Sequence, residues 1–198
     1  MDIKELRKTI RHNRRQLSSK TQQQHQQLLL KNLLNSHLLL KHKRIAIYLH
    51  NDGEVHTDLI IQLLIKHKRQ VYLPSLYPFS KNKLWFLKYF KKISLINNRF
   101  NIPEPHSIKQ RAHIKSLDII FMPLVAFDLQ GNRIGMGGGF YDRTLSHCKK
   151  QGESKKPLLI GLAHELQLVD SIVKQKWDIP LDAIITEKRF IKFSKAFL

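Results

Sequence analysis

The residues best suited to chemistry lie in one short stretch, residues 133–143, which reads Arg-Ile-Gly-Met-Gly-Gly-Gly-Phe-Tyr-Asp-Arg. Four of its eleven residues are glycines, and each glycine costs conformational entropy when the chain becomes ordered. A run of this kind leaves backbone N–H groups free to surround an anion. With an arginine at each end and the carboxylate of Asp142, the stretch predicts a site for a nucleotide phosphate and its metal ion, in preference to an ordinary surface loop.

Two familiar phosphate loops do not fit this stretch. A Walker loop ends in Gly-Lys-Ser or Gly-Lys-Thr, whereas these glycines end at Phe140. The dinucleotide fingerprint G-x-G-x-x-G, counted from Gly135, needs a glycine at the position that Phe140 occupies. A zinc helix is excluded as well, because His164-Glu165 begins the pattern H-E-x-x-H but Leu168 stands where the second histidine is required. We therefore expect an unusual phosphate loop and no metal role for the histidines.

Length and composition are typical of one folded domain. The 198 residues are 42% hydrophobic, enough for a sizeable core, and we expect a single domain over residues 1–198. No apolar run approaches the roughly 18 residues needed to cross a bilayer. The charged N-terminus does not resemble a secretory signal, and the single cysteine, Cys148, fits a reducing compartment. We expect a monomeric, cytoplasmic protein with no membrane partner.

The formal net charge of +20 is the unusual feature of the composition. Residues 1–44 hold eleven lysines and arginines against only Asp2 and Glu5. Such a charge attracts anions of any kind, so one reading is a basic nucleic-acid-binding module. The other is a general lysine-rich bias spread over the surface, which the high usage of Asn, Gln, Lys and Ile along the chain favours. The sequence has no basic motif interleaved with aromatics of the RNA-binding kind, so we expect no specific nucleic-acid partner.

Hydrophobic periodicity predicts alternating helices and strands. Helices are expected over residues 2–16, from a capping box at residues 19–22 onward, over residues 57–67 and over residues 141–149. Strands are expected at residues 44–49, 71–73, 84–87, 118–122, 158–161 and 183–186. This alternation predicts an α/β domain with a mostly parallel sheet.

The order of these elements also places the candidate site. Ligands of such sheets bind beyond the carboxyl ends of the strands. Glu54 follows the first expected strand, and the glycine-rich stretch follows the strand at residues 118–122. If these two strands are parallel neighbours, Glu54 and the glycines face one crevice.

The chain resembles the 5-formyltetrahydrofolate cyclo-ligase family, also called methenyltetrahydrofolate synthetases, nearly from end to end. The central pattern G-x-G-x-G-[YF]-Y-D-R, at residues 135–143, is the most specific part of the likeness. The other matching segments are the basic N-terminal helix, Tyr48-Leu49 with Glu54, Asn101-Ile-Pro-Glu-Pro105, Phe121-Met-Pro123, Phe127-Asp128, Gly131-Asn-Arg133, and Trp177-Asp178 before Asp182.

The resemblance implies a fold and a reaction. Members of the family have a three-layer α/β/α fold like that of sugar-phosphate isomerases and CoA transferases. They convert 5-formyltetrahydrofolate to 5,10-methenyltetrahydrofolate with ATP and Mg²⁺, releasing ADP and phosphate. The terminal phosphoryl group of ATP passes to the formyl oxygen, and the neighbouring folate amine then closes the ring. Both nucleophiles belong to the substrate, so no Ser, Cys or His nucleophile is required, and the protein supplies placement and charge neutralisation.

The resemblance also implies roles for individual residues. ATP binding falls on the N-terminal cations and on the glycine-rich stretch: Lys4, Arg7, Lys8, Arg133, Ile134, Gly135, Met136, Gly137, Gly138, Gly139, Phe140 and Tyr141. Folate binding falls on two residues after the first strand and on part of the same stretch: Leu49, Glu54, Met136, Gly137, Gly138, Gly139 and Phe140. Arg133, Arg143 and Tyr141 are the expected catalytic residues, and Asp142 and Asp178 the expected ligands of Mg²⁺.

Individual residues keep simpler alternatives at this stage. Glu54 suits an amino-pterin edge, which would donate paired hydrogen bonds to its carboxylate, but it could be a solvated turn acid. Tyr141 could stack on a ring or be a core aromatic at a helix start. Asp142 suits both a metal ion and the first turn of a helix. The chain departs from the family pattern before Trp177, where it has Val173 in place of a proline and Lys174-Gln-Lys176 in place of acidic residues, so the likeness supports Asp142 more strongly than Asp178.

The expected substrates are thus a reduced folate, with or without a polyglutamate tail, and ATP. Two other functions remain open from the residues alone. One is the nucleic-acid-binding module already described. The other is an ATP-dependent enzyme that acts on a different small acid.

Overall fold

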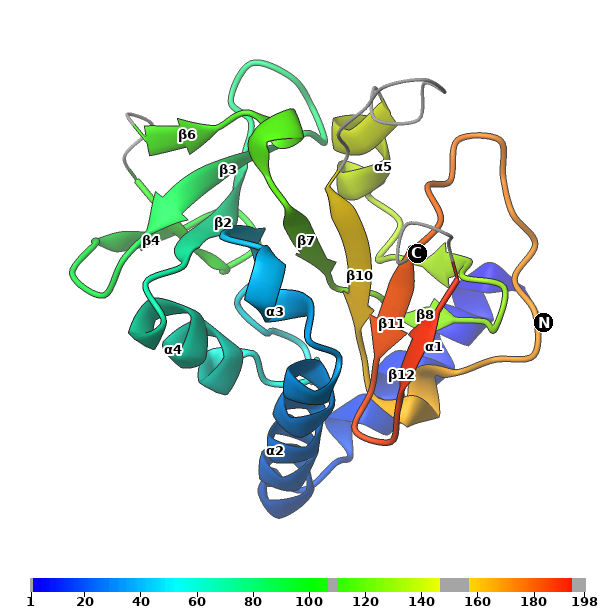
Figure 1. Cartoon of the computed structure of the whole chain (residues 1–198). Coiled ribbons are helices and arrows are strands. Elements are labelled where there is room, and N and C mark those ends of the chain that lie inside the picture. The colour runs from blue at the N-terminus through cyan, green and yellow to red at the C-terminus, as the bar shows by residue number, and fades with distance from the viewer. Residues whose placement is uncertain (1, 107–109, 147–156, 194–198) are drawn as a thin grey trace.

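The computed structural model describes residues 2–106, 110–146 and 157–193. Its centre is an eight-stranded sheet in the order β12-β11-β10-β7-β1-β2-β3-β6 (Figure 1). The strands are β1 (Arg44–Ala46), β2 (Gln70–Leu76), β3 (Leu84–Tyr89), β6 (Arg111–Ala112), β7 (Ile119–Met122), β10 (Leu158–Leu162), β11 (Ala183–Ile185) and β12 (Phe190–Lys192). Two short hairpin-like sheets lie outside it: β4 (Leu95–Asn97) with β5 (Pro103–Pro105), and β8 (Ala126–Phe127) with β9 (Arg133–Ile134).

The middle of the sheet is parallel, as the alternation of helices and strands predicts. β1 pairs in parallel with both β2 and β7, and β10 pairs in parallel with β7 and β11. The antiparallel strands lie at the two edges, where β12 pairs with β11 and β3 joins β2 to β6. The carboxyl ends of β1 and β7 therefore lie side by side, which is the arrangement that brings Glu54 and the glycine-rich stretch to one end of the sheet.

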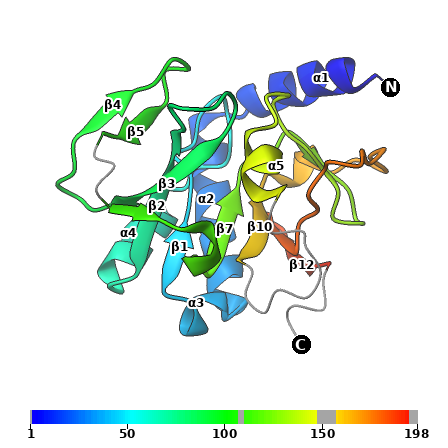
Figure 2. The same ribbon diagram turned by 90° about the horizontal axis from the view of Figure 1, so that it is seen from above.

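Apolar side chains of the sheet face two separate layers. On one face, Ile45, Val71 and Phe121 pack in a cluster with Leu29 and Ile60, which belong to α2 (Ser19–Asn35) and α4 (Asp58–Lys66). The short helix α3 (Leu38–Lys41) joins the same layer. In Figure 2, α5 (Phe140–Leu145) lies on the side of the sheet away from α3 and α4. Helix α1 (Ile3–Arg15) lies beyond the carboxyl ends of β1 and β7, where Arg14 donates to the Asp52 and Leu124 carbonyls.

The opposite face is covered by less helix and more loop. Ala46, Ile120 and Ile184 pack there with Leu145 of α5 and with Leu181 from a loop. Short 3₁₀ turns, η2 (Ile114–Ser116) and η4 (Glu165–Gln167), complete the connections. The expected α/β class with a mostly parallel sheet is confirmed. No described helix is long and apolar enough to cross a membrane.

Several boundaries differ from the sequence prediction. The capping box predicted at residues 19–22 is wrong by one residue: Ser18 is the N-cap of α2, and its Oγ accepts a hydrogen bond from the Thr21 N–H at 3.1 Å. β1 ends at Ala46 instead of residue 49. The helix predicted over residues 141–149 begins at Phe140, and its last predicted residues, from 147 on, lie outside the described residues.

Candidate active site

The glycine-rich loop joins β9 to α5 and depends on glycine at two positions. Gly137 has φ +96° and Gly139, the residue before α5, has φ +63°. Other residues rarely adopt these angles. A Cβ on Gly139 would also lie 2.6 Å from Nη1 of Arg143. Gly135 differs from both, because no described atom lies within 4 Å of the place where its Cβ would be.

Cations from two elements hold the carbonyls of this loop. Arg7 of α1 donates from Nε to the Gly135 carbonyl at 2.8 Å, although the two residues are far apart in sequence. Arg143 of α5 donates to the Gly138 carbonyl at 2.5 Å. Backbone carbonyls, instead of carboxylates, therefore hold the positive charges of Arg7 and Arg143 beside the loop.

Arg133 and Asp142 form a largely buried ion pair beside the loop. Nη2 of Arg133 lies 2.9 Å from Oδ1 of Asp142, and the two side chains are 4% and 18% exposed. The same Oδ1 accepts a hydrogen bond from the Ile179 N–H at 3.1 Å. Nε of Arg133 is buried and has no hydrogen-bond partner among the described residues. An unpartnered buried donor of this kind is costly, and it is suited to receive an anion.

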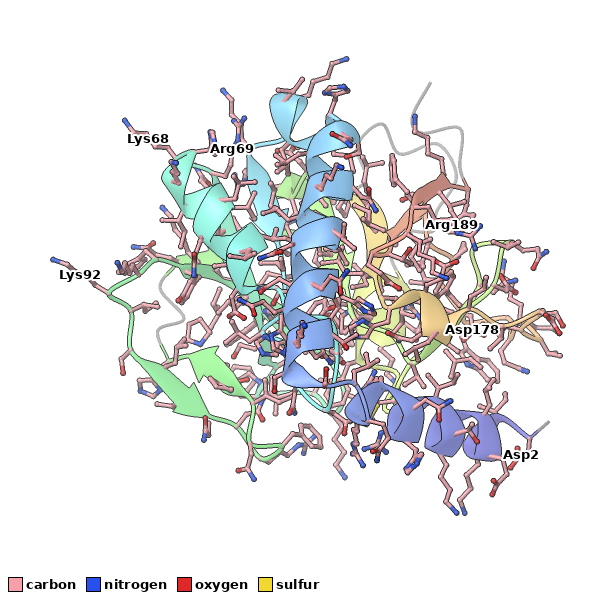
Figure 3. The ribbon with its side chains drawn as sticks, turned by 90° about the horizontal axis from the view of Figure 1, so that it is seen from below. Asp2, Lys68, Arg69, Lys92, Asp178 and Arg189 are labelled. Atoms are coloured by element: carbon pink, nitrogen blue, oxygen red, sulfur yellow. The ribbon has the colours of Figure 1, made fainter. Side chains whose placement is uncertain are left out.

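These groups line a cavity of about 840 Å³. Of the predicted residues, Lys4, Arg7, Arg133, Ile134, Gly135, Gly137, Gly139, Asp142, Arg143 and Asp178 lie on its wall. Figure 3 shows Asp2, at the start of α1, and Asp178 on the same side of the molecule, and both contribute to this wall. Segments from the N-terminus, the glycine loop and the loop before β11 thus converge on one space, as the resemblance implied.

The cavity also has wall residues to which sequence reasoning gave no role. Lys83 and Lys176 add to its positive charge, and Trp177 presents an indole that is 67% exposed. Trp177 could have been noticed, since it stands next to the predicted metal ligand Asp178. Lys83 belongs to no motif. It reaches the site because β3, which begins at the next residue, lies beside α5, where the Leu84 N–H donates to Thr144 Oγ1 at 2.8 Å.

The other predicted residues are not part of this wall. Lys8, Leu49, Glu54, Met136, Gly138, Phe140 and Tyr141 are absent from the described lining. Glu54 and the glycine loop therefore do not share this cavity, although both follow the carboxyl ends of parallel strands. Phe140 lines a second cavity of about 470 Å³, together with Phe79, Arg99 and Glu104. Lys83 lines both cavities, so they open next to each other.

The second cavity has an aromatic rim. Phe79 is 81% exposed, and its ring contacts Tyr77 and Trp85 edge to face at centroid distances of 5.8 and 6.2 Å. On another side, Phe100 meets Phe140 edge to face at 5.8 Å. Exposed aromatic rings grouped beside a cavity are suited to hold a flat, partly apolar ligand.

Glu54 belongs to the turn that follows β1 and is the most perturbed acid near the site. Its side chain is 13% exposed, and Asn51 N–H donates to its Oε2 at 3.1 Å. Burial raises the pKa of Glu54 to about 7, against the opposing influence of the Arg14 guanidinium 4.0 Å away. A carboxyl with such a pKa can be protonated or ionised near neutrality, which is typical of functional sites.

Two tyrosines lie within electrostatic reach of Glu54. Burial raises the pKa of Tyr48 and of Tyr141, and the carboxylate of Glu54 raises both further. Tyr48 donates to the Leu162 carbonyl at 3.3 Å, while Tyr141 packs on the core cluster beneath α5. Tyr141 thus follows the glycine loop and lies within electrostatic reach of Glu54. Its ring is also partly a core element, which is one of the two readings that the sequence left open.

Cations outside the cavity do not all gather in one place. In Figure 3, Lys68 and Lys92 lie on one side of the view and Arg189 on the other. Arg189 is paired with Glu165. The cavity wall, by contrast, brings six cations together with three carboxylates: Lys4, Arg7, Lys83, Arg133, Arg143 and Lys176 with Asp2, Asp142 and Asp178.

A parallel sheet that carries a cationic glycine loop at the carboxyl ends of its strands defines the chain as an α/β protein with an anion-binding cavity. Comparison with known proteins identifies it further. Residues 2–187 match the profile of the 5-formyltetrahydrofolate cyclo-ligase family, and the chain belongs to that family.

Relatives and solved structures agree with this assignment. The chain is 40% identical to the 5-formyltetrahydrofolate cyclo-ligase of Haemophilus influenzae, over 91% of this chain and 95% of the relative. It is 38% identical to that of Escherichia coli strain K12, over 91% and 97%. The solved structure of 5,10-methenyltetrahydrofolate synthetase from Aquifex aeolicus superposes with a TM-score of 0.83 at 30% identity, covering 99% of this chain and 95% of that one.

Proposed function

We propose that the 840 Å³ cavity binds ATP with Mg²⁺ and that the Glu54 turn and the aromatic cavity bind the reduced folate. The family's reaction is the ATP-dependent cyclisation of 5-formyltetrahydrofolate to 5,10-methenyltetrahydrofolate, and the chain is a ligase of this kind. The observation that supports this placement of the two substrates is that the two cavities share a wall residue. A phosphate-type cavity and an aromatic cavity meet at Lys83, and Phe140, which follows the glycine run, lines the aromatic one.

The first step transfers a phosphoryl group and needs dense positive charge. The formyl oxygen attacks the terminal phosphorus of ATP, and ADP leaves. Negative charge spread over the phosphoryl oxygens is met by the open backbone N–H groups of the loop and by Lys4, Arg7 and Arg143 on the cavity wall. The buried Nε of Arg133 supplies a further donor that no described residue uses.

The second step closes the ring. The folate amine attacks the activated formyl carbon and releases its proton to solvent or phosphate, the carbon–oxygen bond breaks, and phosphate departs with the formyl oxygen. The protein assists by holding the two substrate groups in reach of each other. Phe140 suits this task because it follows the glycine loop directly and faces the aromatic cavity.

Asp142 and Asp178 fit a magnesium ion. Mg²⁺ is a hard ion that takes one or two protein carboxylates together with phosphate oxygens and water, and both aspartates lie on the wall of the cavity. Oδ1 of Asp142 is oriented by Arg133 and by the Ile179 N–H, which holds the carboxylate toward the cavity side of α5. Asp142 and Asp178 would hold Mg²⁺ on this wall, and the ion would neutralise charge on the phosphates.

Folate recognition is divided between two places. The Glu54 carboxylate, when ionised, accepts hydrogen bonds from the amino edge of the pterin. The benzoyl ring fits the exposed aromatic rim around Phe79, and Lys81, Lys83 and Arg99 on the same wall suit the carboxylates of one or more glutamates. Polyglutamylated folates would therefore bind more tightly than the monoglutamate. We propose that the chain acts as a monomer.

The test is an assay with purified protein, ATP, Mg²⁺ and 5-formyltetrahydrofolate. We expect a methenyl product that absorbs near-ultraviolet light, formed in step with ADP. Reactions without ATP and reactions with a magnesium chelator are the controls. No product across a range of magnesium concentrations and pH values would mean that the site acts on a different small acid.

A further inference from the structure

The turn that carries Glu54 is fixed to α1 through Asp52. The Asp52 carboxylate accepts hydrogen bonds from Arg11 Nε at 2.8 Å, from Arg14 Nη2 at 2.7 Å and from Arg15 Nε at 2.5 Å. Burial alone would raise the pKa of Asp52, but these hydrogen bonds outweigh it and lower the pKa to about 2. The carboxylate is thus ionised and shared by three guanidinium groups of one helix.

Arg14 is the buried member of this group. Its side chain is 0% exposed, and it also donates to the Asp52 carbonyl at 2.7 Å and to the Leu124 carbonyl at 3.2 Å. The turn approaches the helix closely, since a Cβ on Gly53 would lie 3.0 Å from the Arg14 carbonyl oxygen. An ion pair in such surroundings is costly to break, because one charge would remain buried without a partner.

The other end of α1 belongs to the nucleotide cavity. Ile3, Lys4 and Arg7 lie on the cavity wall, and Arg7 holds the Gly135 carbonyl at 2.8 Å. The helix runs for 13 residues, about 20 Å at 1.5 Å per residue. Near its start, α1 therefore presents cations to the proposed phosphate site. One to two turns further along, its arginines donate hydrogen bonds to Asp52 in the proposed folate turn.

We propose that Asp52 is a positioning residue that couples ligand binding at the two sites. Nucleotide that contacts the first turns of α1 orders the Glu54 turn through Asp52. Folate bound at Glu54 orders α1 in the same way. The proposal rests on the proposed function. Coupling of this kind is reciprocal, so each ligand raises the affinity for the other by the same factor.

The experiment measures that factor directly. The dissociation constant of a non-hydrolysable ATP analogue with Mg²⁺ is determined by calorimetry, with and without saturating 5-formyltetrahydrofolate. We expect folate to tighten nucleotide binding by about fivefold or more in the unaltered chain. In Asp52→Asn, which keeps the side-chain shape but removes the charge, each ligand still binds alone and the factor falls toward one. A purely structural role would weaken both affinities without changing their ratio.

Two further variants make the result decisive. Asp58→Asn is the matched control, because Asp58 is half exposed, lies on α4 and pairs with His50 instead of α1, so its factor should equal that of the unaltered chain. Arg11→Gln with Arg15→Gln removes the two more exposed partners of Asp52 and should lower the factor even if Asp52→Asn fails to fold.

The possible failures are distinguishable. Binding of both ligands to the unaltered chain with a factor of one would overturn the coupling alone. An unchanged factor in Asp52→Asn or in the double arginine variant would overturn the role of Asp52. Failure of the unaltered chain to bind either ligand would overturn the proposed function itself.

Discussion

The Glu54 turn follows β1 of the central sheet, and the glycine loop follows β9 of the small β8–β9 sheet, but the two segments are held in opposite ways. Side chains of α1, of α2 and of the residue that precedes η4 form hydrogen bonds with Asp52 and Gly53 of the turn. In addition to the arginines, Gln22 donates to the Gly53 carbonyl at 3.3 Å, and His164 Nε2 contacts the same oxygen at 3.3 Å. The glycine loop has far fewer such contacts, and its Met136 is 53% exposed.

The histidine contact shows how thoroughly the turn is fixed. Burial, with His25 next to it, lowers the pKa of His164 to about 3, so its ring is neutral. A carbonyl can only accept, so Nε2 of His164 carries the proton and donates to Gly53. Nδ1 of His164 is then free to accept from His25 Nδ1 at 2.9 Å. The turn is thus bonded to α2 both directly and through a relay of two imidazoles.

The difference matches what we propose that each region recognises. A pterin edge has fixed donors, and a rigid, buried carboxylate discriminates best among such ligands because a wrong one leaves it unpaired. A triphosphate passes through changes of charge and geometry during transfer, and an open loop of N–H donors surrounded by cations can follow them. Preformed recognition and adaptable charge neutralisation are therefore placed on adjacent segments, with α1 in contact with both.

The largest effect is expected from Asp142→Asn, on the glycine-loop side. The variant keeps the shape of the side chain but removes the charge that pairs with Arg133 and that we assign to Mg²⁺. We expect turnover to fall about 100-fold or more, with a higher magnesium requirement, measured by methenyl formation across a magnesium titration. Asp170→Asn, at an exposed position, should behave as the unaltered chain. Full turnover in Asp142→Asn at low magnesium would contradict the metal assignment.

A somewhat smaller loss is expected from Glu54→Gln, on the turn side. Loss of a charged hydrogen-bond acceptor should lower kcat/KM for folate by about 10- to 100-fold. In the unaltered chain, folate affinity should rise with pH between 6 and 8, because the pKa of Glu54 is about 7 and the ionised form is the acceptor. The variant should show no such rise. An identical pH profile in both proteins would exclude Glu54 from folate binding.

Stability should change in the opposite direction in the same variant. Burial raises the pKa of Glu54 from 4.5 to about 7 in the folded chain, so the folded state holds the proton more tightly than the unfolded state. Its contribution to the free energy of unfolding is therefore lost as the pH rises from about 4.5 to 7. Glu54→Gln removes this cost and should be more stable than the unaltered chain at pH 8, by up to about 3 kcal/mol, as measured by urea unfolding. Gained stability with lost affinity would mark a residue retained for function.

A pair of glycine variants sharpens the account of the loop. Gly139→Ala forces an alanine to φ +63° and places its Cβ 2.6 Å from Arg143 Nη1, so we expect a loss of about 1 kcal/mol or more in stability. Gly135→Ala meets no described atom within 4 Å and should unfold like the unaltered chain. Its methyl group would instead occupy space in the cavity and raise the KM for ATP. Equal stability of the two variants would mean that the loop relaxes freely around residue 139.

Much of this arrangement could be predicted from the sequence, because local patterns carry it. Alternating helices and strands gave the parallel sheet, and glycine spacing with Phe140 to Arg143 located the loop. The capping box was misplaced because Ser18 and Ser19 offer the same hydroxyl to the first turn of α2. The helix boundary at residue 141 was one residue late because Gly139, at φ +63°, already redirects the chain.

What the sequence left out depends on contacts between distant segments. The sequence gives no role to Asp52, since nothing local shows that three arginines of α1 converge on it. The ion pair of Arg133 with Asp142 joins two residues that had been given separate tasks. Lys83 reaches both cavities because it lies in the turn between β2 and β3, which pair in antiparallel fashion near one edge of the sheet. Charge and motif predict the kind of group needed, but tertiary packing decides which residue meets which.

The smallest effect separates local charge from overall charge. Lys4→Gln removes one cation from the cavity wall and should raise the KM for ATP only a few-fold, because an exposed charge contributes about 1 kcal/mol or less. Lys92→Gln removes the same charge at an edge remote from Asp178 (Figure 3) and should leave the KM unchanged at 0.15 M salt, since charges further apart than about 8 Å are then largely screened. Steady-state kinetics at low and physiological salt distinguishes the two. If Lys92→Gln raised the KM as much as Lys4→Gln at both salt concentrations, the general surface charge, and not the wall around the glycine loop, would be attracting the nucleotide.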